Sequence, residues 1–258
     1  MAGALLWENL FHFLIIFIRT SGLLAAMPLF GGAGVPIHVR AGLAALVAMV
    51  LFPVVPLGPA PVEPVALALL AAQELAVGLA MGFIVALFMY ALQVAGQLVD
   101  VPIGFGMVNV LDPNFGGQIP IMGQFFNVLA VLLFFVVNGH HVVLRALADS
   151  YREIPVGTAA WDGSVLEAAL GAVSAAFLLG VRIALPVMAV TLLTDVALGI
   201  VNRAVPQINV FITGYPLKIF LGVLVTAVAL PIYVTLLAAL FGDGGEMARW
   251  LWRFLSAL

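Results

Sequence analysis

Ionisable residues are rare in this chain, and the few that interrupt its apolar stretches are the first candidates for chemistry. Arg19, Arg182 and Asp195 each lie inside an apolar block. A charged side chain at the centre of a membrane helix costs about 2.5 to 3.5 kcal/mol, so such groups are usually paired or functional. Arg182 and Asp195 could relay a proton or a solute. Alternatively, because Pro186 lies between them to kink or break a helix, they could form an ion pair across a helical hairpin.

Two adjacent histidines, His140 and His141, are the other candidates. Neighbouring side chains on a helix point about 100° apart, so the two rings cannot chelate one metal ion as histidines at i and i+4 do. We expect them to close a helix at an aqueous boundary. The sequence has no P-loop, and its segment GFGMVN lacks the third glycine of a dinucleotide-binding turn. We therefore expect no metal, no cofactor and no enzyme activity.

The composition indicates a chain surrounded by lipid or by other proteins. Of its 258 residues, 65% are hydrophobic and 8% are charged, whereas a soluble domain carries about a quarter charged residues. These charges are too few to cover a soluble core. The formal net charge of -3 includes no basic run that would bind nucleic acid, and the absence of cysteine excludes disulfides.

Six apolar blocks would position these residues. Three of them are uncharged over about 24 residues or more, enough to cross a hydrocarbon layer of ~30 Å as a helix. Short turns rich in proline and glycine separate the blocks, so the predicted fold is all-α and membrane-associated. The blocks are Leu10–Phe30, Ala41–Leu57, Pro64–Val99, Ile119–Leu144, Ala168–Asn202 and Ile219–Gly242.

The most polar connection, Asp149–Glu167, divides the predicted single domain of residues 1–258 into an N-terminal part, 1–148, and a C-terminal part, 168–258. Lys and Arg in the connections show no bias that would orient the chain by the positive-inside rule. An ordinary helix bundle in lipid fits this pattern poorly. A chain whose apolar surface is largely covered by partner proteins would tolerate both the missing bias and the charges inside the blocks.

Two local patterns predict how helices pack. Gly78 and Gly82 have the spacing that lets two helix backbones approach closely, although membrane helices also tolerate glycine without such a contact. The C-terminal segment predicts an amphipathic helix that either lies on a membrane surface, which we favour, or caps a neighbouring subunit. Its apolar stripe consists of Met247, Trp250, Leu251, Phe254 and Leu258.

The segment from Gly104 to Pro120 combines glycines and a turn at Asp112–Pro113 with apolar side chains. It is either a plain connection at the membrane boundary or a movable apolar seal inside a channel, because Met and Leu side chains repack easily. Its candidate sealing residues are Phe105, Met107, Val108, Val110, Leu111, Phe115, Gly116 and Gly117.

A second unusual stretch, PQINVFITGYPLKIF, gathers polar residues and prolines between two apolar blocks. Pro206 and Pro216 should stop helices, which frees backbone groups that Gln207 and Asn209 can satisfy. We predict that these polar residues satisfy the freed backbone groups and also contact neighbouring subunits. Lys218 could then snorkel or pair with an acidic group on a neighbouring subunit.

Three segments carry a resemblance to a known family. They are AGQLVDVPIGFGMVNVLDP, LFFVVNGHHVVLRALADSYREIPVG and LGIVNRAVPQINVFITGYPLKIFLG. In them the NGH motif, Ser150-Tyr151 followed by Pro155, and Pro206-Gln207 followed by Asn209-Val210-Phe211 stand in the order of the FliR/SctT family of type III secretion export apparatus subunits. The chain resembles this family over nearly its whole length.

The resemblance implies an export-gate subunit of the flagellar type III secretion system in the bacterial inner membrane, at the flagellar basal body. In that family, kinked helical hairpins assemble with FliP and FliQ into a helical complex around a conduit, and unfolded flagellar proteins pass through it. FlhA and FlhB are further partners, besides membrane lipid. The resemblance also assigns residues 104–120 the role of a plug that closes the conduit at rest.

Two alternative hypotheses for the function remain. The equivalent subunit of a virulence injectisome shares the architecture and the stretch that contains Pro206-Gln207. A secondary transporter for a small solute would explain Arg182, Asp195 and the broken helices, but the sequence contains no convincing internal repeat.

Overall fold

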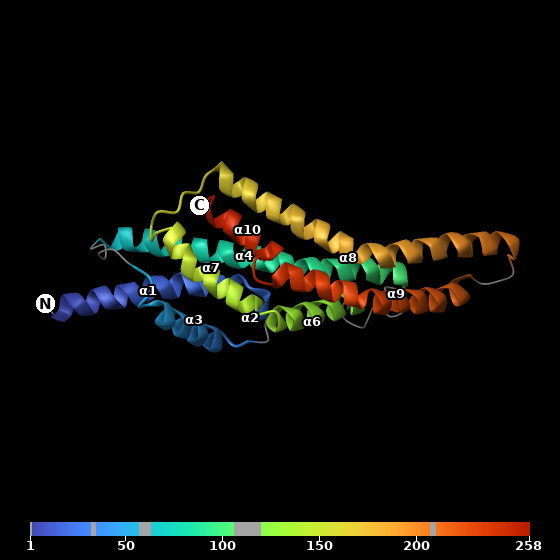
Figure 1. Cartoon of the computed structure of the whole chain (residues 1–258), viewed down its shortest axis with the longest axis horizontal. Helices are drawn as coiled ribbons and strands as arrows, with labels where there is room; N and C mark the ends of the chain where they lie inside the picture. The colour runs from blue at the N-terminus through green and yellow to red at the C-terminus, as the bar shows by residue number, and fades with distance from the viewer. Residues whose placement is uncertain (1, 32–34, 57–62, 106–119, 207–209) are drawn as a thin grey trace. The chain divides into compact units, whose positions relative to one another are not determined.

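The structure is a computed structural model that describes residues 2–31, 35–56, 63–105, 120–206 and 210–258. Every regular element in these ranges is a helix, which confirms the predicted all-α class (Figure 1). The helices are α1 (Ala2–Ala26), α2 (Pro28–Gly31), α3 (Ile37–Leu51), α4 (Pro64–Ile103), α6 (Ile121–Val136), α7 (Gly139–Glu153), α8 (Gly163–Ala204), α9 (Val210–Phe241) and α10 (Glu246–Leu255).

Four stretches of the described residues are long and apolar enough to cross a membrane: Leu6–Ala26, Pro64–Ile103, Gly163–Ala204 and Gly214–Leu255. They lie in α1, α4, α8 and the α9–α10 region. Helices α6 and α7 form a further candidate span that bends by 66° at its break. The membrane association predicted from composition is therefore confirmed by helix length and apolarity.

The break between α6 and α7 divides a block that the sequence analysis treated as continuous, Ile119–Leu144. Asn138 adopts a left-handed conformation with φ of 59°, and α7 begins at the next residue, Gly139. Asparagine tolerates this conformation better than most residues, which explains why the chain turns here. His140 and His141 thus open a helix, and the expectation that they close one is wrong.

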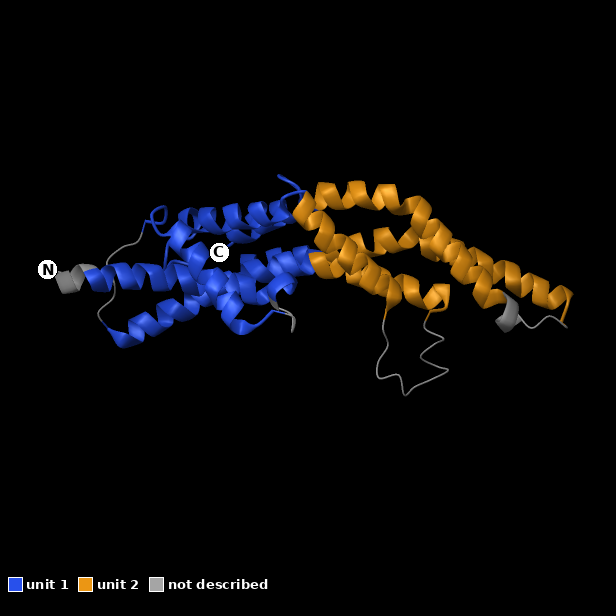
Figure 2. Ribbon diagram, turned by 90° about the horizontal axis from the view of Figure 1, so that it is seen from below, with its two compact units in different colours: residues 1–88, 137–173, 241–258 blue, residues 89–136, 174–240 orange. Residues whose placement is uncertain are grey.

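The chain forms two compact units, each assembled from segments far apart in the sequence (Figure 2). Unit 1 contains residues 1–88, 137–173 and 241–258, and unit 2 contains residues 89–136 and 174–240. Each unit therefore combines segments from both halves of the chain. The chain passes from one unit to the other after residues 88, 136, 173 and 240. The polar connection Asp149–Glu167, where a division was predicted, lies wholly inside unit 1.

In unit 1, α1 and α4 touch backbone to backbone. A methyl group added to Gly78 would lie 2.0 Å from the carbonyl oxygen of Arg19, and one added to Gly82 would lie 2.5 Å from that of Leu23. A methyl group added to Gly22 of α1 would lie 2.7 Å from the carbonyl oxygen of Leu75 of α4. The close packing that the glycine spacing suggested is confirmed, and α1 is the helix that α4 meets.

The C-terminal helix α10 also belongs to unit 1, where it packs against α7. The predicted apolar stripe is correct, since Met247, Leu251 and Phe254 are all buried. The preference for a membrane surface is wrong, because the chain itself covers this stripe. The ring of Trp250 lies over Gly171 of α8, where a methyl group would come within 2.7 Å of it.

In unit 2, close contacts join the C-terminal part of α4 to α6 and α8. A methyl group on Gly96 would lie 2.3 Å from the backbone of Gly123, and one on Gly180 would lie 2.8 Å from the carbonyl oxygen of Ala91. Aromatic packing adds α9, because the rings of Phe126 and Tyr233 meet edge to face at 5.5 Å.

Helices α8 and α9 expose many large apolar side chains in the isolated chain. Such a surface has to be covered by lipid or by protein. The exposed residues include Leu192, Leu193, Val196 and Ile200 of α8 and Phe220, Val228 and Ile232 of α9.

Replacing Gly78 with alanine tests the contact between α1 and α4. We expect Gly78→Ala to lower the free energy of unfolding by about 1 to 3 kcal/mol or more, because the added methyl group overlaps the Arg19 carbonyl. Thermal unfolding in mild detergent measures the effect. Gly199→Ala on α8 is the control, since a methyl group there meets nothing within 4 Å and should leave the protein as stable or slightly more stable. Equal stability of the two variants would contradict the contact.

Candidate functional site

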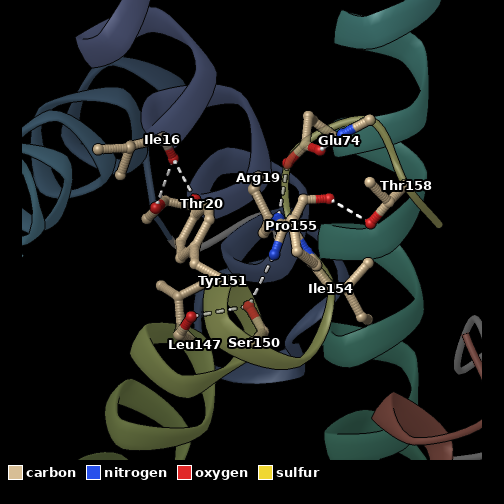
Figure 3. Close-up of polar contacts among 11 residues, drawn as sticks. Ile16, Arg19, Thr20, Glu74, Leu147, Ser150, Tyr151, Ile154, Pro155 and Thr158 are labelled. Atoms are coloured by element: carbon tan, nitrogen blue, oxygen red, sulfur yellow. Dashed lines mark hydrogen bonds and ion pairs between the residues drawn. The ribbon is translucent and has the colours of Figure 1, made fainter. Parts of the chain in front are cut away.

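Polar side chains of the described residues gather in two clusters, one in each unit. The first, in unit 1, surrounds Arg19, which has no exposed surface. We call it the arginine node and define it as Arg19, Glu74, Ser150, Tyr151 and the Ile154 carbonyl (Figure 3). These groups come from α1, from α4, and from α7 with the residue that follows it.

Every nitrogen of the Arg19 guanidinium donates a hydrogen bond. Nε donates to Glu74 Oε2 at 2.7 Å, Nη1 to Ser150 Oγ at 3.0 Å and Nη2 to the Ile154 carbonyl at 3.2 Å. The centre of the guanidinium lies 4.0 Å from the centroid of the Tyr151 ring, close enough for a cation–π interaction. A buried arginine is thereby paired on its edges and covered on one face.

The node is extended by neighbouring bonds. The Ser150 hydroxyl donates to the Leu147 carbonyl at 2.7 Å, and the Tyr151 hydroxyl donates to the Ile16 carbonyl at 3.4 Å. Thr20 donates to the same Ile16 carbonyl at 2.7 Å (Figure 3). Helix α7 is therefore held against α1 by polar bonds and by the contact of the Tyr151 ring with the Arg19 guanidinium.

Glu74 connects the node to the chain that follows α7. Its second oxygen, Oε1, accepts the backbone N–H of Gly157 at 3.2 Å, and the neighbouring Gln73 amide donates to the Ala159 carbonyl at 3.0 Å. Gly157 has a φ of +78°, which other residues seldom adopt. The connection from α7 to α8 is thus fixed to α1 and α4 over residues 154–159.

The same connection ends in a capped helix. Asp162 accepts the backbone N–H of Ser164 at 2.8 Å and so caps the start of α8. Hydrogen bonds from the hydroxyl and the backbone of Ser164 hold the pKa of Asp162 below its usual value. The C-terminus closes this region, because the Leu258 carbonyl accepts the N–H of Ala160 at 2.6 Å.

The second cluster, in unit 2, holds the two ends of the segment that the sequence analysis identified as a possible seal. Asp100 of α4 accepts the backbone N–H groups of Met122 at 2.9 Å and Gly123 at 3.2 Å. These are first-turn groups of α6, so Asp100 caps that helix from a distant position in the chain. Asp100 is itself buried.

The backbone of Asp100 also ends α4. Gly104, with φ of +104°, donates to the Val101 carbonyl at 3.1 Å, and Phe105 donates to the Asp100 carbonyl at 3.2 Å, the bonds of a Schellman motif. We call Asp100, Gly104, Met122 and Gly123 the loop base. One aspartate therefore anchors both the last described residues before 106–119 and the first helix after them.

Helix α9 supports the loop base. A methyl group on Gly104 would lie 2.7 Å from the ring of Tyr215, and one on Gly222 would lie 2.5 Å from the side chain of Ile103. The Tyr215 ring in turn lies 5.7 Å from the ammonium of Lys218. Lys218 forms an ion pair with Asp195, which joins α9 to α8.

The structure describes only part of the predicted seal and of the polar stretch. Phe105 is half-buried. The predicted site residues that lie outside the described ranges are Met107, Val108, Val110, Leu111, Phe115, Gly116, Gly117, Gln207 and Asn209, and the side chain of Phe211 is likewise not described.

The two prolines of the polar stretch behave differently. Pro206 follows the end of α8 at Ala204, as expected, whereas Pro216 lies inside α9. The expectation that Pro216 stops a helix is therefore wrong. Its missing N–H costs one hydrogen bond, but the turns on both sides continue the helix.

Arg182 and Asp195 are not brought together. Both lie on α8, which continues through Pro186, and thirteen residues of helix separate them by about 20 Å. The predicted ion pair across a hairpin is therefore wrong, and Asp195 pairs with Lys218 instead. Both side chains are exposed in the isolated chain, so the chain itself does not bury these charges.

Sequence reasoning singled out Arg19 but missed its partner Glu74, and it missed Asp100 altogether. The sequence contained a sign of it, because Glu74 is an acidic residue inside the apolar block Pro64–Val99. The described residues contain no group of three histidine, aspartate or glutamate side chains placed to hold a metal ion. The two clusters consist of hydrogen bonds and ion pairs that join helices.

Comparison with known proteins identifies relatives over almost the full chain. Residues 10–244 match the family described as "Bacterial export proteins, family 1". The chain is 35% identical to the flagellar biosynthetic protein FliR of Bacillus subtilis over 92% of this chain and 93% of that protein. It is 29% identical to FliR of Escherichia coli over 92% and 90%. It is also 29% identical to the secretion system apparatus protein SsaT of Salmonella typhimurium, over 61% of each chain.

Removing the charge of Glu74 tests the arginine node. We expect Glu74→Gln to lower the free energy of unfolding by about 3 to 5 kcal/mol, because Arg19 would keep its charge in a buried site without an acidic partner. Thermal unfolding of the full chain in mild detergent measures the loss.

The matched control is Arg145→Gln, which breaks the exposed ion pair of Arg145 with Asp243. It should change stability by about 1 kcal/mol at most. A Glu74→Gln variant as stable as this control would contradict the role assigned to the node.

Proposed function

The chain belongs to the bacterial export proteins, family 1, and from this premise we propose that it joins FliP and FliQ in forming the conduit for unfolded flagellar proteins, sealed by its apolar loop at residues 104–120. It is a subunit of the flagellar protein export apparatus in the bacterial inner membrane, at the flagellar basal body. The observation that carries the proposal is the match to flagellar FliR proteins over about nine-tenths of both chains.

The exposed apolar faces of α8 and α9 support assembly with partner subunits. Phe220, Val228 and Ile232 are more than half exposed in the isolated chain. Gly199 of α8 faces open space, so a partner helix can approach the α8 backbone there. We propose that FliP and FliQ cover these faces in a complex of kinked helical hairpins, and that FlhA and FlhB are further partners. In that complex, Gln207, Asn209 and Phe211 would contact neighbouring subunits.

The exposed charges on α8 fit the same assembly. Arg182 lies in an otherwise apolar part of the helix and is exposed in the isolated chain. Contact with acyl chains would leave it without partners, whereas a neighbouring subunit can supply acidic or polar groups. Burial of Arg182 and Asp195 is thus proposed to arise only in the complex.

The loop base supports the sealing role of residues 104–120. A segment that blocks a conduit needs fixed ends, and the bonds of Asp100 fix both ends within unit 2. The packing of Gly104 against Tyr215 adds a third support from α9. The apolar side chains that follow Phe105 in the sequence can exclude water and ions at rest.

The equivalent injectisome subunit is the second candidate, and the relative SsaT favours it. That match covers 61% of the chain, whereas the match to FliR of Bacillus subtilis covers 92% with higher identity. We therefore favour the flagellar system. The transporter hypothesis loses its main support, because Arg182 and Asp195 lie about 20 Å apart on one helix.

Co-expression tests the assembly. We expect the affinity-tagged chain, expressed with FliP and FliQ and purified in mild detergent, to elute as one large hetero-oligomer, because these subunits are proposed to cover the exposed apolar faces of α8 and α9. Mass measurement of the intact complex gives its composition. Recovery of the chain only as a monomer or homodimer would overturn the proposal and return attention to a solute transporter.

Replacing Asp100 tests the seal. We expect Asp100→Ala to leave the N–H groups of Met122 and Gly123 without their acceptor. An unsatisfied buried donor costs about 1 to 3 kcal/mol of stability, so the ends of the loop should be held less firmly. The assembled complex in vesicles should then leak a trapped fluorescent dye or ions faster than the wild type.

Two further variants separate an effect of the loop base from an effect of the loop itself. Asp243→Ala removes an exposed carboxylate outside the loop base and should leave the vesicles tight. Deletion of Gly116 and Gly117 acts on the loop itself. If the deletion leaks but Asp100→Ala does not, the loop seals without help from its base. If both stay tight in an assembled complex, residues 104–120 are not the seal.

A further inference from the structure

Four carboxamide side chains of unit 2 lie on the two helices that carry the loop base. We call them the amide face and define it as Gln93 and Gln97 of α4 with Gln124 and Asn127 of α6. Gln97 and Gln124 are exposed in the isolated chain, and Gln93 and Asn127 are half-buried. None of the four side chains forms a hydrogen bond within the part of the chain that the structure describes.

The contact between α4 and α6 is close and antiparallel. A methyl group on Gly96 of α4 would lie 2.3 Å from the backbone of Gly123 of α6. The two helices run in opposite directions within unit 2 (Figure 1). These two glycines therefore mark the line along which the helices face each other.

Helical periodicity places the four carboxamides on one side of this line. At about 100° per residue, Gln93 and Gln97 lie about 60° and 100° around α4 from its contact glycine. Asn127 and Gln124 lie about 40° and 100° around α6 from its contact glycine, in the same rotational sense. In an antiparallel pair, rotation in the same sense on both helices leads to the same side, so the amide face is one continuous surface.

The other side of the contact is the apolar core of unit 2. Leu92 and Val99 of α4 and Met122 and Phe126 of α6 lie there by the same periodicity, and all four are buried. The amide face therefore forms the outer side of the helix pair. Its groups are available to whatever lies beside unit 2.

Lipid is a poor neighbour for this face. A carboxamide that faces hydrocarbon without a hydrogen-bond partner is costly. The exposed faces of α8 and α9 differ in this respect, because large apolar side chains cover them. The amide face thus needs water or polar groups opposite it.

The face also lacks charge. Within the described residues 89–105 and 120–136, Asp100 is the only acidic or basic residue, and it is buried in the loop base. A carboxamide both donates and accepts hydrogen bonds. The main chain of a polypeptide offers the same two kinds of group along its length, whatever its side chains. An uncharged amide surface therefore suits an extended chain of any sequence and does not hold it by charge.

The loop base joins the amide face directly. Gln97 lies one helical turn before Asp100, and Gln124 follows Gly123, whose N–H donates to Asp100 at 3.2 Å. Both described ends of the proposed sealing segment are thus attached beside the face. A polypeptide that passed the proposed seal would also pass these four side chains.

We propose that the amide face lines the conduit and forms transient hydrogen bonds with the main chain of the unfolded polypeptide in transit. This inference rests on the proposed function, because it requires that the chain helps to form a conduit. The face is separate from the apolar faces of α8 and α9, which are proposed to contact partner subunits.

Crosslinking tests which molecule lies beside the face. The chain contains no cysteine, so Gln97→Cys and Gln124→Cys each introduce a single thiol. Each tagged variant replaces the wild type in cells whose export apparatus is blocked by a flagellar protein fused to a stably folded domain. Benzophenone maleimide then labels the thiol in isolated membranes, and light links it to its neighbour. We expect both variants to capture the stalled flagellar protein.

Ile232→Cys is the matched control, because Ile232 is 60% exposed on the apolar face of α9. It should link to FliP or FliQ and not to the stalled protein. Capture of only FliP or FliQ by Gln97→Cys and Gln124→Cys would overturn the inference but leave the proposed function intact, as would the lack of any product in an assembled complex. Failure of the wild-type chain to co-purify with FliP and FliQ would instead overturn the proposed function.

A second experiment tests the hydrogen bonds themselves. Leucine has about the size of glutamine but cannot form hydrogen bonds, so Gln97→Leu combined with Gln124→Leu should slow export about fivefold, as expected for the loss of one hydrogen bond. Gln97→Asn combined with Gln124→Asn keeps both carboxamides and should export at nearly the wild-type rate. Co-purification with FliP and FliQ shows that each variant assembles. Equal export rates of the two double variants would overturn the role of hydrogen bonding.

Discussion

An arginine with no exposed surface can keep its charge only where protein groups replace the water that it has lost. Arg19 meets this condition in unit 1, because Glu74, Ser150 and the Ile154 carbonyl occupy its three nitrogens and Tyr151 covers its face. Desolvation of each ion costs several kcal/mol, and the ion pair offsets this only when every partner is in place. Each partner fixes a different part of unit 1: Glu74 fixes α4, Ser150 fixes α7, and Ile154 fixes the connection that leads to α8. One side chain thus joins α1 to α4, to α7 and to the connection that follows α7.

Glycine contacts work together with this polar pairing. In an apolar medium, helices gain little from burying apolar surface, so close van der Waals packing and hydrogen bonds become the main attractions between them. Gly78 permits the α4 backbone to reach the Arg19 carbonyl. The residue that supplies the buried charge therefore also supplies a close backbone contact between α1 and α4. A substitution that disturbs the contact at Gly78 should therefore also disturb the hydrogen bonds of Arg19, and the reverse.

In unit 2, polar bonds join the helices to one another, while apolar side chains remain exposed on the outer faces of α8 and α9. Asp100 satisfies the first N–H groups of α6 and ends α4, and Lys218 joins α9 to α8. The outer faces of α8 and α9 remain apolar and exposed in the isolated chain. In the proposed conduit, the bonds of Asp100 would hold both ends of the sealing segment, and partner subunits would cover the exposed faces.

The sequence by itself determined the helical class and the membrane association, because hydrophobic content and the length of apolar runs are properties of the sequence and not of folding. It also indicated the family, through the order of short motifs that resemble those of its members. It also placed the apolar stripe of α10 and the glycine contact at Gly78, since both follow from helical periodicity. The partners of these features were decided only by the tertiary structure. Arg19 and Glu74 are 55 residues apart, and Asp100 caps a helix that starts 21 residues later. Local patterns cannot predict such pairs, because residues distant in the sequence meet only through packing. For the same reason, Asp195 pairs with Lys218 and α10 packs against α7 in ways that periodicity did not indicate.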